Sequence, residues 1–395
     1  MKKIKDNLIF KICLAIVTGI IFGQLTFIPD TLYITITTFT SIFKEFLNFV
    51  IPLMILAFVT KGIAEINNNA GKLLFITTGL SYFSSIIAGL FAYGVNSIIL
   101  PSFINKDIVN SLTSHANELQ PAFEFKLTPV MDVTSAIVFA FIIGIGISHL
   151  RQHQQGKELF QIFCDFEMII QKLLSGLMIP MLPFYIFGNF VQLSYSGTVF
   201  YILSVFWKVF ILVILLHIIY LSLLFLIASI YGRKNFMTLV RHQMPAYVTA
   251  LGTQSSAATI PVNLEAAKNN GVLEDVRNCV IPLCATIHLA GSMITIVSCS
   301  LASILIYNIP YDFNLILTFI IVLGLVMVAA PGTPGGAIMS ALPFLPMIHI
   351  NSEIIQQLMI SLYITQDSFG TAANISGDNA LAIIINRFIH KDNRY

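Results

Sequence analysis

The sequence predicts an all-α polytopic membrane protein, and three observations lead to that prediction. Of its 395 residues, 56% are hydrophobic and only 10% are charged, whereas a soluble globular protein carries about 25% charged residues. The mean hydropathy is +0.85. Several uninterrupted apolar segments reach or exceed the roughly 20 residues that a helix needs to cross the hydrocarbon core of a bilayer.

Six long apolar segments occupy the first part of the chain and predict six spans. The first follows the basic sequence MKKIKDN, but no small-residue cleavage site comes after it, so we expect a retained span and not a signal peptide. Several segments are longer than one crossing requires, which implies tilt or extension beyond the bilayer. The segments are residues 8–28, 39–65, 72–100, 130–150, 160–192 and 199–231.

The distribution of basic residues predicts the orientation of these spans. Lys and Arg concentrate in the loops that lie on the same side as the N-terminal lysines, and the positive-inside rule places that side in the cytoplasm. The C-terminal basic residues then also lie in the cytoplasm, which requires an even number of crossings. The polar segment 101–129 falls on the opposite side, so we expect an extracellular loop there.

Residues 236–270 predict a first re-entrant hairpin. Its two arms, residues 236–252 and 257–270, are too short and too polar to cross the bilayer separately. Between them lies LGTQSSAATIPV (251–262). Irregular backbone at membrane depth is tolerated only where protein or a cavity covers it, so the chain is expected to enter and return on one side.

A broken helix and a second hairpin follow. Residues 273–304 predict a helix interrupted at ATIHLAGS (285–292). Residues 314–350 predict a hairpin bent at APGTPGGA (330–337), where two prolines and three glycines break the helix. Repeated units of hairpin plus span, with discontinuous helices meeting near the midplane, are typical of secondary transporters.

The remaining part of the chain is organised around residues 363–386, which predict an apolar helix with one polar stripe. At about 100° per residue, the four stripe residues fall within about 60° of one another. A charge near the bilayer centre costs on the order of 3 kcal/mol or more, so its carboxylates need partners. The stripe consists of Asp367, Thr371, Asn374 and Asp378.

No Lys or Arg lies in this stretch before Arg387. The partner of the carboxylates is therefore expected from outside the chain, as a metal ion, a proton or a substrate ammonium group. The alternative is a buried polar helix that neighbouring helices satisfy.

Composition and motifs exclude several other classes of protein. The net charge of +2 comes without a basic patch interleaved with aromatic residues, so no nucleic-acid partner is predicted. Five single cysteines without CxxC spacing predict neither a disulfide framework nor a zinc site. The sequence has no HExxH, GxSxG or P-loop motif, so we expect a protein that is not an enzyme.

Four motifs in order carry a resemblance to a known family: QSSAATIPV (254–262), IPLCATIHLAGS (281–292), APGTPGGA (330–337) and QDSFGTAANISGD (366–378). They resemble the dicarboxylate/amino acid:cation symporter family, which includes the glutamate transporters and serine/threonine symporters. FLNFVIPLMILAFVTKGI (46–63) is similar to the second helix of that family. The resemblance implies a glutamate-transporter-like fold of eight transmembrane helices plus two re-entrant helical hairpins, assembled as a homotrimer.

The resemblance also implies roles for individual residues. Serines at the tip of the first hairpin would donate to a substrate carboxylate, and Asp367 would receive the substrate ammonium group. Asp378 would be a cation ligand, since hard cations prefer oxygen ligands. The implied substrate-binding set is Ser255, Ser256, Ser292, Pro334, Gly335, Asp367, Gly370, Thr371 and Asn374; the implied cation set is Asp378, Asn374, Thr286 and His288.

The sequence departs from the family pattern at the broken helix. Where the family usually reads asparagine, methionine, aspartate, glycine and threonine, this chain has His288, Leu289, Ala290, Gly291 and Ser292. The aspartate that serves one cation site is therefore missing. His288 is open to two interpretations, a hydrogen-bonded packing residue or a proton-titrating substitute for the lost cation site.

Two further departures affect the substrate. Gly370 stands where the family's arginine binds an acidic side chain, and Tyr363 replaces a further acidic position one turn before Asp367. We therefore expect a secondary active symporter for a small, neutral amino acid, coupled to Na⁺ or H⁺. The alternatives are a symporter for dicarboxylates or acidic amino acids, and a transport-inactive or channel-like relative.

The resemblance also divides the chain and implies a multi-pass protein of the plasma (cell inner) membrane, and the basic residues predict that both termini are cytoplasmic. The expected parts are scaffold spans 1 and 2 (1–70), span 3 of the transport part (71–100), an extracellular loop (101–129), scaffold spans 4 and 5 (130–192), span 6 of the transport part (199–231) and the transport core (232–395).

Overall fold

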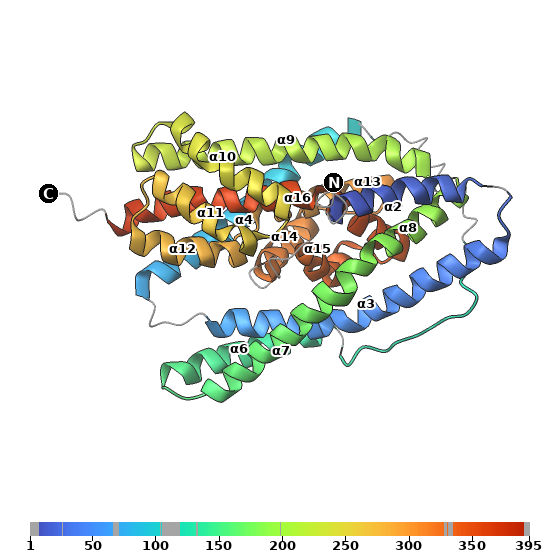
Figure 1. The fold of residues 1–395 in the computed structure, drawn as a ribbon, viewed down its shortest axis with the longest axis horizontal. Helices are drawn as coiled ribbons and strands as arrows, with labels where there is room; N and C mark the ends of the chain where they lie inside the picture. The colour runs from blue at the N-terminus through green and yellow to red at the C-terminus, as the bar shows by residue number, and fades with distance from the viewer. Residues whose placement is uncertain are drawn as a thin grey trace.

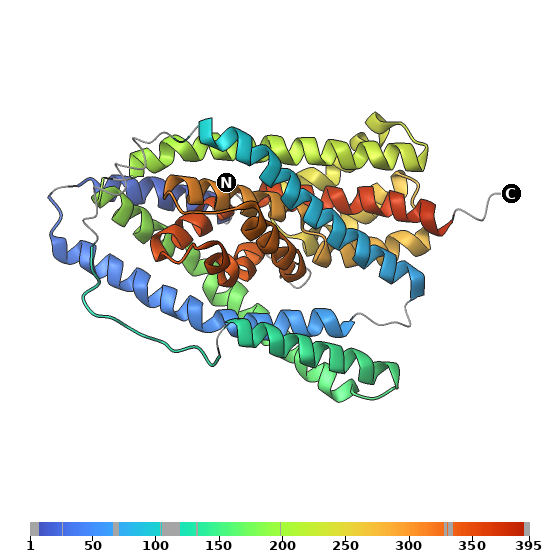
Figure 2. The ribbon, with the colours of Figure 1, turned by 180° about the vertical axis from the view of Figure 1, so that it is seen from behind.

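A computed structural model describes residues 8–25, 27–65, 71–102, 104, 119–131, 133–197, 199–327, 330 and 335–390. Within these residues the chain is helical and contains no β-strand (Figures 1 and 2), which confirms the all-α prediction. Of the predicted loop over residues 101–129, residues 103 and 105–118 lie outside the described residues, and so do residues 331–334 of the predicted bend at 330–337.

The helices of the first part follow the predicted apolar segments, apart from α2, which ends at Gly23 and not near residue 28, and apart from two larger differences. The first concerns α3, which begins at Asp30 and not near residue 39. Its early turns are rich in threonine, and the hydroxyls of Thr35 and Thr38 donate to the carbonyls four residues earlier, at 2.7 Å each. Because these hydroxyls are satisfied inside the helix, it extends past the apolar segment. The helices are α2 (Leu8–Gly23), α3 (Asp30–Glu65), α4 (Gly71–Ile99), α6 (Val133–Gln152), α7 (Lys157–Leu173), α8 (Ile179–Tyr195) and α9 (Val199–Gly232).

The second difference concerns the fifth apolar segment, which is bent. A π-helical segment, Leu174–Met178, separates α7 from α8, and the two helices differ in direction by 52°. Pro180 and Pro183 lie in the first turns of α8 and remove backbone donors there. The apolar segment 160–192 therefore forms two helices with a bend between them, and this bend was not predicted.

The second part of the chain contains the predicted helix pairs and the predicted break. Both arms of the first hairpin agree closely with their predicted bounds. The helix predicted over 273–304 is interrupted at His288 and Leu289, and the helix of the polar stripe begins earlier than expected, at Glu353. The elements are α10 (Phe236–Thr253), α11 (Ser256–Asn269), α12 (Glu274–Ile287), α13 (Ala290–Ile306), α14 (Phe313–Met327), α15 (Gly336–Ala341), the 3₁₀ helix Leu342–Ile348 and α16 (Glu353–Ile389).

The helices pack in two groups. In one, α2 lies against α8, and α3 lies against α6, α7 and α8; Figure 1 shows α3, α6 and α7 below the rest of the molecule. In the other, α16 is surrounded by α4, α9, α10, α11, α12 and α13. Few contacts join the two groups; α16 with α2 and α8 provides some of them.

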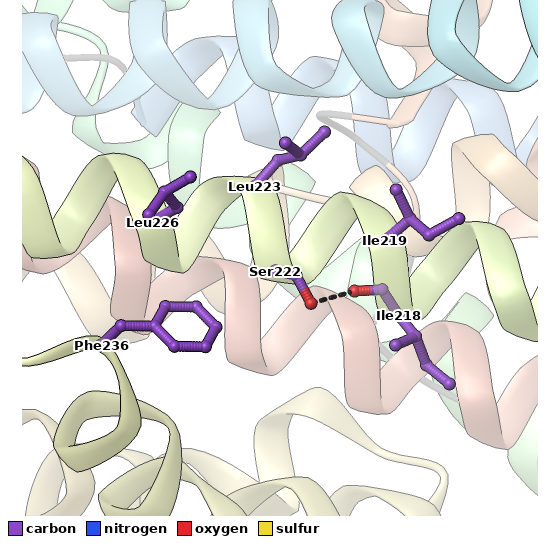
Figure 3. Close-up of a pocket in the computed structure, with 6 residues that line it drawn as sticks. All are labelled: Ile218, Ile219, Ser222, Leu223, Leu226 and Phe236. Atoms are coloured by element: carbon purple, nitrogen blue, oxygen red, sulfur yellow. Dashed lines mark hydrogen bonds between the residues drawn. The ribbon is translucent and has the colours of Figure 1, made fainter.

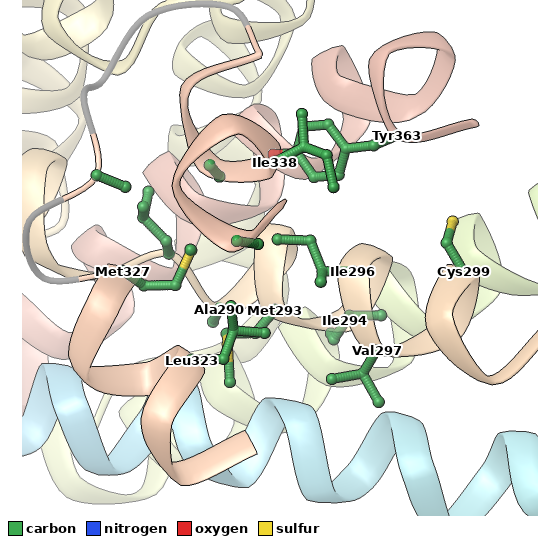
Figure 4. Close-up of a cluster of buried hydrophobic side chains, with 14 of the residues drawn as sticks. Ala290, Met293, Ile294, Ile296, Val297, Cys299, Leu323, Met327, Ile338 and Tyr363 are labelled. Atoms are coloured by element: carbon green, nitrogen blue, oxygen red, sulfur yellow. The ribbon is translucent and has the colours of Figure 1, made fainter. Parts of the chain in front are cut away.

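Helix α13 is central to the second group, because all of its residues except Leu305 are buried. A helix that is buried on every side is typical of a protein core or a membrane interior. Figure 4 shows its side chains Ile294 and Val297 in a cluster that also contains Leu323 of α14 and Ile338 of α15.

Three helices among the described residues are long and apolar enough to cross a membrane: Phe75–Ser102, Val205–Gly232 and Glu274–Ile306. The bent pair α7 and α8 adds a fourth if it forms one span. The larger count of eight spans and two re-entrant hairpins therefore stays a prediction.

Candidate functional site

The polar stripe of α16 is buried, as predicted. Exposed fractions are 4% for Asp367, 6% for Thr371, 2% for Asn374 and 0% for Asp378. The stripe faces the break between α12 and α13, because Asn374 and Asp378 bond to residues on either side of that break. Burying two carboxylates is unfavourable unless they find partners, so the partners of each one define what the site can do.

Two glycines bring the break into contact with α16. A Cβ atom on Gly291 would lie 2.4 Å from the carbonyl oxygen of Gly370, and one on Gly377 would lie 2.6 Å from Cε1 of His288. Real Cβ atoms do not approach other atoms so closely. The absence of these two side chains therefore allows α13 and His288 to approach the polar stripe.

Asn374 caps the second half of the broken helix. Its Oδ1 accepts from the backbone N–H groups of Gly291 at 2.8 Å and Ser292 at 3.3 Å. These N–H groups lie in the first turn of α13, where no intrahelical acceptor exists. The Nδ2 of Asn374 donates to the Ser292 hydroxyl at 3.1 Å, and the Tyr363 hydroxyl donates to the same oxygen at 2.9 Å.

Asp367 connects α16 to the second hairpin. Its Oδ2 accepts from the backbone N–H of Gly335 at 2.7 Å, and Gly335 has a left-handed φ of 74° that suits glycine. Among the described residues no Lys, Arg or His side chain forms an ion pair with Asp367. Pro334, predicted beside Gly335, lies outside the described residues.

Asp378 is paired with a residue of the break itself. The Nδ1 of His288 donates to Asp378 Oδ1 at 2.9 Å, and both side chains are fully buried. The other ring nitrogen, Nε2, lies 3.0 Å from the Ser84 hydroxyl of α4. That hydroxyl lies 2.9 Å from the hydroxyl of Tyr220 on α9, which donates to the Ser84 carbonyl at 2.7 Å.

The serines of the first hairpin lie where its two arms meet. Gln254 adopts a left-handed φ of 54° at the turn. Ser255 is the N-cap of α11, and its hydroxyl accepts from the N–H of Ala258 at 3.3 Å. Ser256 follows it and is buried, with 3% exposure.

Gly370 and Thr286 complete the predicted residues. A Cβ on Gly370 would make ordinary contacts, 3.6 Å from Thr295 Oγ1 and 3.7 Å from the Ser292 nitrogen. Thr286 is exposed, and its hydroxyl donates to the Leu283 carbonyl at 2.8 Å. The side chain of Thr286 therefore lies apart from the group around Asp378.

Three buried polar residues of this region were not predicted: Ser84, Tyr220 and His217. His217 lies on α9 with 2% exposure, and its Nε2 donates to the carbonyl of Gly291 at 2.9 Å. A histidine within an otherwise apolar span is a signal that sequence analysis could have used, because ionisable residues in spans are costly and usually functional.

An amide cluster holds the first hairpin to α16. Nε2 of Gln243 donates to Oδ1 of Asn263 at 3.1 Å, and Nδ2 of Asn263 donates to the Ile375 carbonyl at 3.0 Å. Asn379 of α16 donates to the side-chain oxygen of Gln243. The hairpin is therefore joined to the stripe helix through side chains from both of its arms.

A groove on the surface is lined by residues other than these polar groups. It is lined by exposed apolar residues of α9 and the first residue of α10, and the Ser222 hydroxyl in it donates to the carbonyl of Ile218 at 2.7 Å (Figure 3). A groove of this composition offers no charged group to a polar ligand. Its lining residues are Ile218, Ile219, Ser222, Leu223, Leu226 and Phe236.

Taken together, the geometry suits binding rather than catalysis. One buried carboxylate, Asp367, is bonded by the Gly335 N–H and by the Tyr363 hydroxyl and has no basic partner among the described residues, and amide and hydroxyl groups lie on the same face. Within the described part of the chain, no group of three or more His, Cys, Asp or Glu side chains is placed to hold a metal ion.

Comparison with known proteins agrees with this description. The profile of the sodium:dicarboxylate symporter family matches residues 8–388. A serine/threonine transporter SstT of Acinetobacter baylyi is 26% identical over 404 residues, covering 96% of this chain and 97% of the relative. A serine/threonine transporter SstT of Streptococcus agalactiae is 27% identical over 390 residues, covering 95% and 94% of the two chains.

Proposed function

The chain belongs to the sodium:dicarboxylate symporter family, and on that premise we propose that it is a cation-coupled symporter for a small, neutral amino acid. Membership makes it an integral membrane transporter and not an enzyme. The substrate, the coupling ion and the roles of individual residues are the subject of the proposal.

Asp367 is the observation that carries the proposal. Its carboxylate is 4% exposed, bonds to the Gly335 N–H, and has no basic side chain as an ion-pair partner among the described residues. Truncating one member of a buried charge pair typically costs about 2–5 kcal/mol, so a buried carboxylate of this kind strongly favours a ligand that supplies a positive charge. The ammonium group of an amino acid supplies it.

The carboxylate of the substrate is assigned to backbone and hydroxyl donors. We place it at the tip of the first hairpin, with Ser255 and Ser256, where the resemblance implied donors. Thr371 and Asn374 lie on the same buried face as Asp367 and would hold the head group. Pro334 and Gly335 of the second hairpin would cover the site.

Gly370 and Ser292 are assigned to the substrate's side chain. An acidic side chain would leave its own charge uncompensated beside Asp367, because Gly370 provides no arginine, and burial of such a charge is heavily disfavoured. The Ser292 nitrogen lies 3.7 Å from the Cβ position of Gly370, next to the Ser292 hydroxyl network. A small hydroxyl-bearing or aliphatic side chain suits these surroundings, and the relatives named serine/threonine transporters support that choice.

Coupling to a cation follows from the family description. The residues assigned to a cation were Asp378, Asn374, Thr286 and His288, but they do not form a set of free oxygen ligands here. Asn374 Oδ1 already accepts from two N–H groups, Asp378 Oδ1 accepts from His288, and Thr286 faces away. Sodium and the proton are both candidates for the coupling ion.

The two packing groups support a division into scaffold and transport parts. We assign α2, α3, α6, α7 and α8 to the scaffold, and α4 with α9 to α16 to the part that moves the substrate by alternating access. A homotrimer, cytoplasmic termini and location in the inner membrane complete the proposal, and they rest on the resemblance and on the basic residues of the loops.

Competition for binding tests the proposed substrate class. Purified protein in lipid nanodiscs is incubated with labelled serine, and unlabelled serine, alanine, aspartate, succinate and lysine are added as competitors. Serine and alanine are expected to displace the label at much lower concentrations than aspartate or succinate. Equal displacement by aspartate or succinate would overturn the assignment of Gly370.

A further inference from the structure

The side chain of His288 lies where the family resemblance predicts a cation ligand, and it is bonded to Asp378 itself. The two groups are 2.9 Å apart, and each has 0% side-chain exposure. Gly377 makes this approach possible, since a Cβ there would lie 2.6 Å from the imidazole Cε1. The break in the helix places His288 in extended backbone geometry, with φ −109° and ψ 94°, at the end of α12.

The rest of the imidazole is also held in place. Its Nε2 lies 3.0 Å from the hydroxyl of Ser84, and that hydroxyl lies 2.9 Å from the hydroxyl of Tyr220. Groups from α4, α9, α12 and α16 therefore form one hydrogen-bonded chain. Both ring nitrogens of His288 have partners, so the ring is fixed against Asp378.

The side-chain oxygen atoms around Asp378 do not by themselves make up a sodium site. Hard cations are bound by several oxygen ligands at once. The Oδ2 of Asp378 is buried without a hydrogen-bond partner among the described residues, but it is a single oxygen. Position 290 is alanine and offers no carboxylate, and Oδ1 of Asn374 is occupied by the Gly291 and Ser292 N–H groups.

The hydrogen-bond donors available to Asp378 lead to the same conclusion. A fully buried carboxylate requires a counter-charge or strong donors, and His288 is the one basic side chain that pairs with Asp378 in the part of the chain that the structure describes. A sodium ion bound to Oδ1 would have to displace the imidazole from that oxygen.

We infer that His288, and not a bound sodium ion, is the partner of Asp378 in this transporter, so that this position contributes no sodium ion to symport. The inference rests on the proposed function for its meaning in transport. It also explains the departures from the family pattern at positions 288 and 290 together. The histidine side chain occupies the place where the family usually has the oxygen atoms of an asparagine and an aspartate.

The test measures sodium binding without transport. Thermal unfolding of purified protein in detergent is recorded in sodium chloride and in choline chloride of equal ionic strength, for the wild type, Asp378→Asn, His288→Asn and the double variant. Asparagine at 288 restores the family's amide oxygen and leaves Asp378 without its basic partner. Labelled-serine binding is measured on the same samples.

The sodium-dependent shift in Tm of the wild type is expected to be the same in Asp378→Asn, because no sodium ion is bound there. His288→Asn is expected to gain an additional sodium-dependent rise of at least about 2 °C, since ligand binding stabilises the folded state. The double variant is expected to lose that gain, because the new site needs Asp378.

Loss of the wild-type sodium shift in Asp378→Asn would overturn the inference, and so would a folded His288→Asn variant that gains no shift. If His288→Asn does not fold, the comparison of wild type with Asp378→Asn decides alone. Absence of serine binding to the wild type would instead contradict the proposed function, while the Tm comparison would still decide the partner of Asp378.

Discussion

Gly291 lies so close to Gly370 that a Cβ atom on Gly291 would be 2.4 Å from the Gly370 carbonyl oxygen. The same atom would be 2.7 Å from the Cβ of Ala373. Both neighbours belong to α16 and cannot move without moving that helix. This contact holds the start of α13 against the polar stripe. It thereby keeps the first N–H groups of α13 within hydrogen-bond distance of Asn374.

Substitution Gly291→Ala is therefore expected to force α13 away from α16 and to destabilise the fold by about 1–3 kcal/mol, as overpacking does. It is also expected to weaken serine binding, because the Asn374 cap is disturbed. Thermal unfolding and serine binding measure the two effects. Gly79→Ala is the control: nothing lies within 4 Å of a Cβ at that exposed position. Equal Tm values for the two variants would contradict the packing argument.

Asp367→Asn is expected to lower the affinity for serine at least thirtyfold, because the ammonium group loses its carboxylate partner and such a truncation typically costs about 2–5 kcal/mol. The fold should persist, since an amide oxygen can still accept from the Gly335 N–H. Asp165→Asn, at an exposed position of α7, is the matched control and should bind serine like the wild type. Unchanged serine affinity in Asp367→Asn would remove the central residue from the proposed site.

Gly370→Arg is expected to shift the preference toward aspartate, because a guanidinium at this position can pair with a second carboxylate. A Cβ atom at position 370 would lie 3.6 Å or more from its nearest neighbours, so the first carbon of the new side chain fits. Competition of aspartate against labelled serine gives the ratio of affinities. Gly370→Gln adds length without charge; if it gained aspartate affinity equally, charge would not be the cause.

Asn374→Ala is expected to leave the N–H groups of Gly291 and Ser292 without an acceptor. An unsatisfied buried donor costs about 1–3 kcal/mol, so the variant should unfold at a lower temperature and bind serine less tightly. Asn314→Ala is the control, because it removes an amide at an exposed position of α14. A Tm for Asn374→Ala no lower than that of the control would mean that the cap contributes no stability.

The sequence was most informative where a local pattern decides the structure. Hydropathy placed most of the helices, and the turn residues around Gln254 placed the tip between α10 and α11. Periodicity predicted the buried stripe on α16, because a 3.6-residue repeat brings Asp367 and Asp378 to one face whatever packs against it. The early start of α3 was missed because its threonines satisfy their hydroxyls within the helix.

The partners of the stripe could not be predicted, because they come from distant parts of the chain. Ser84 and His288 are 204 residues apart, and His288 and Asp378 are 90 residues apart. Nothing in the local sequence of His288 distinguishes a packing role from a cation-site role. The choice depends on which side chains the folded chain brings to both ring nitrogens.

Accumulation of labelled serine in proteoliposomes tests directly whether transport is coupled to a cation gradient. The protein is reconstituted, and an inward gradient of sodium ions or of protons is imposed separately, with potassium on both sides as the control for ionic strength. Cation-coupled symport predicts saturable uptake that exceeds equilibration when one of these gradients is present, that dissipates with the gradient, and that Asp367→Asn abolishes. Uptake that follows the serine gradient alone, whichever ion gradient is imposed, would contradict cation-coupled symport.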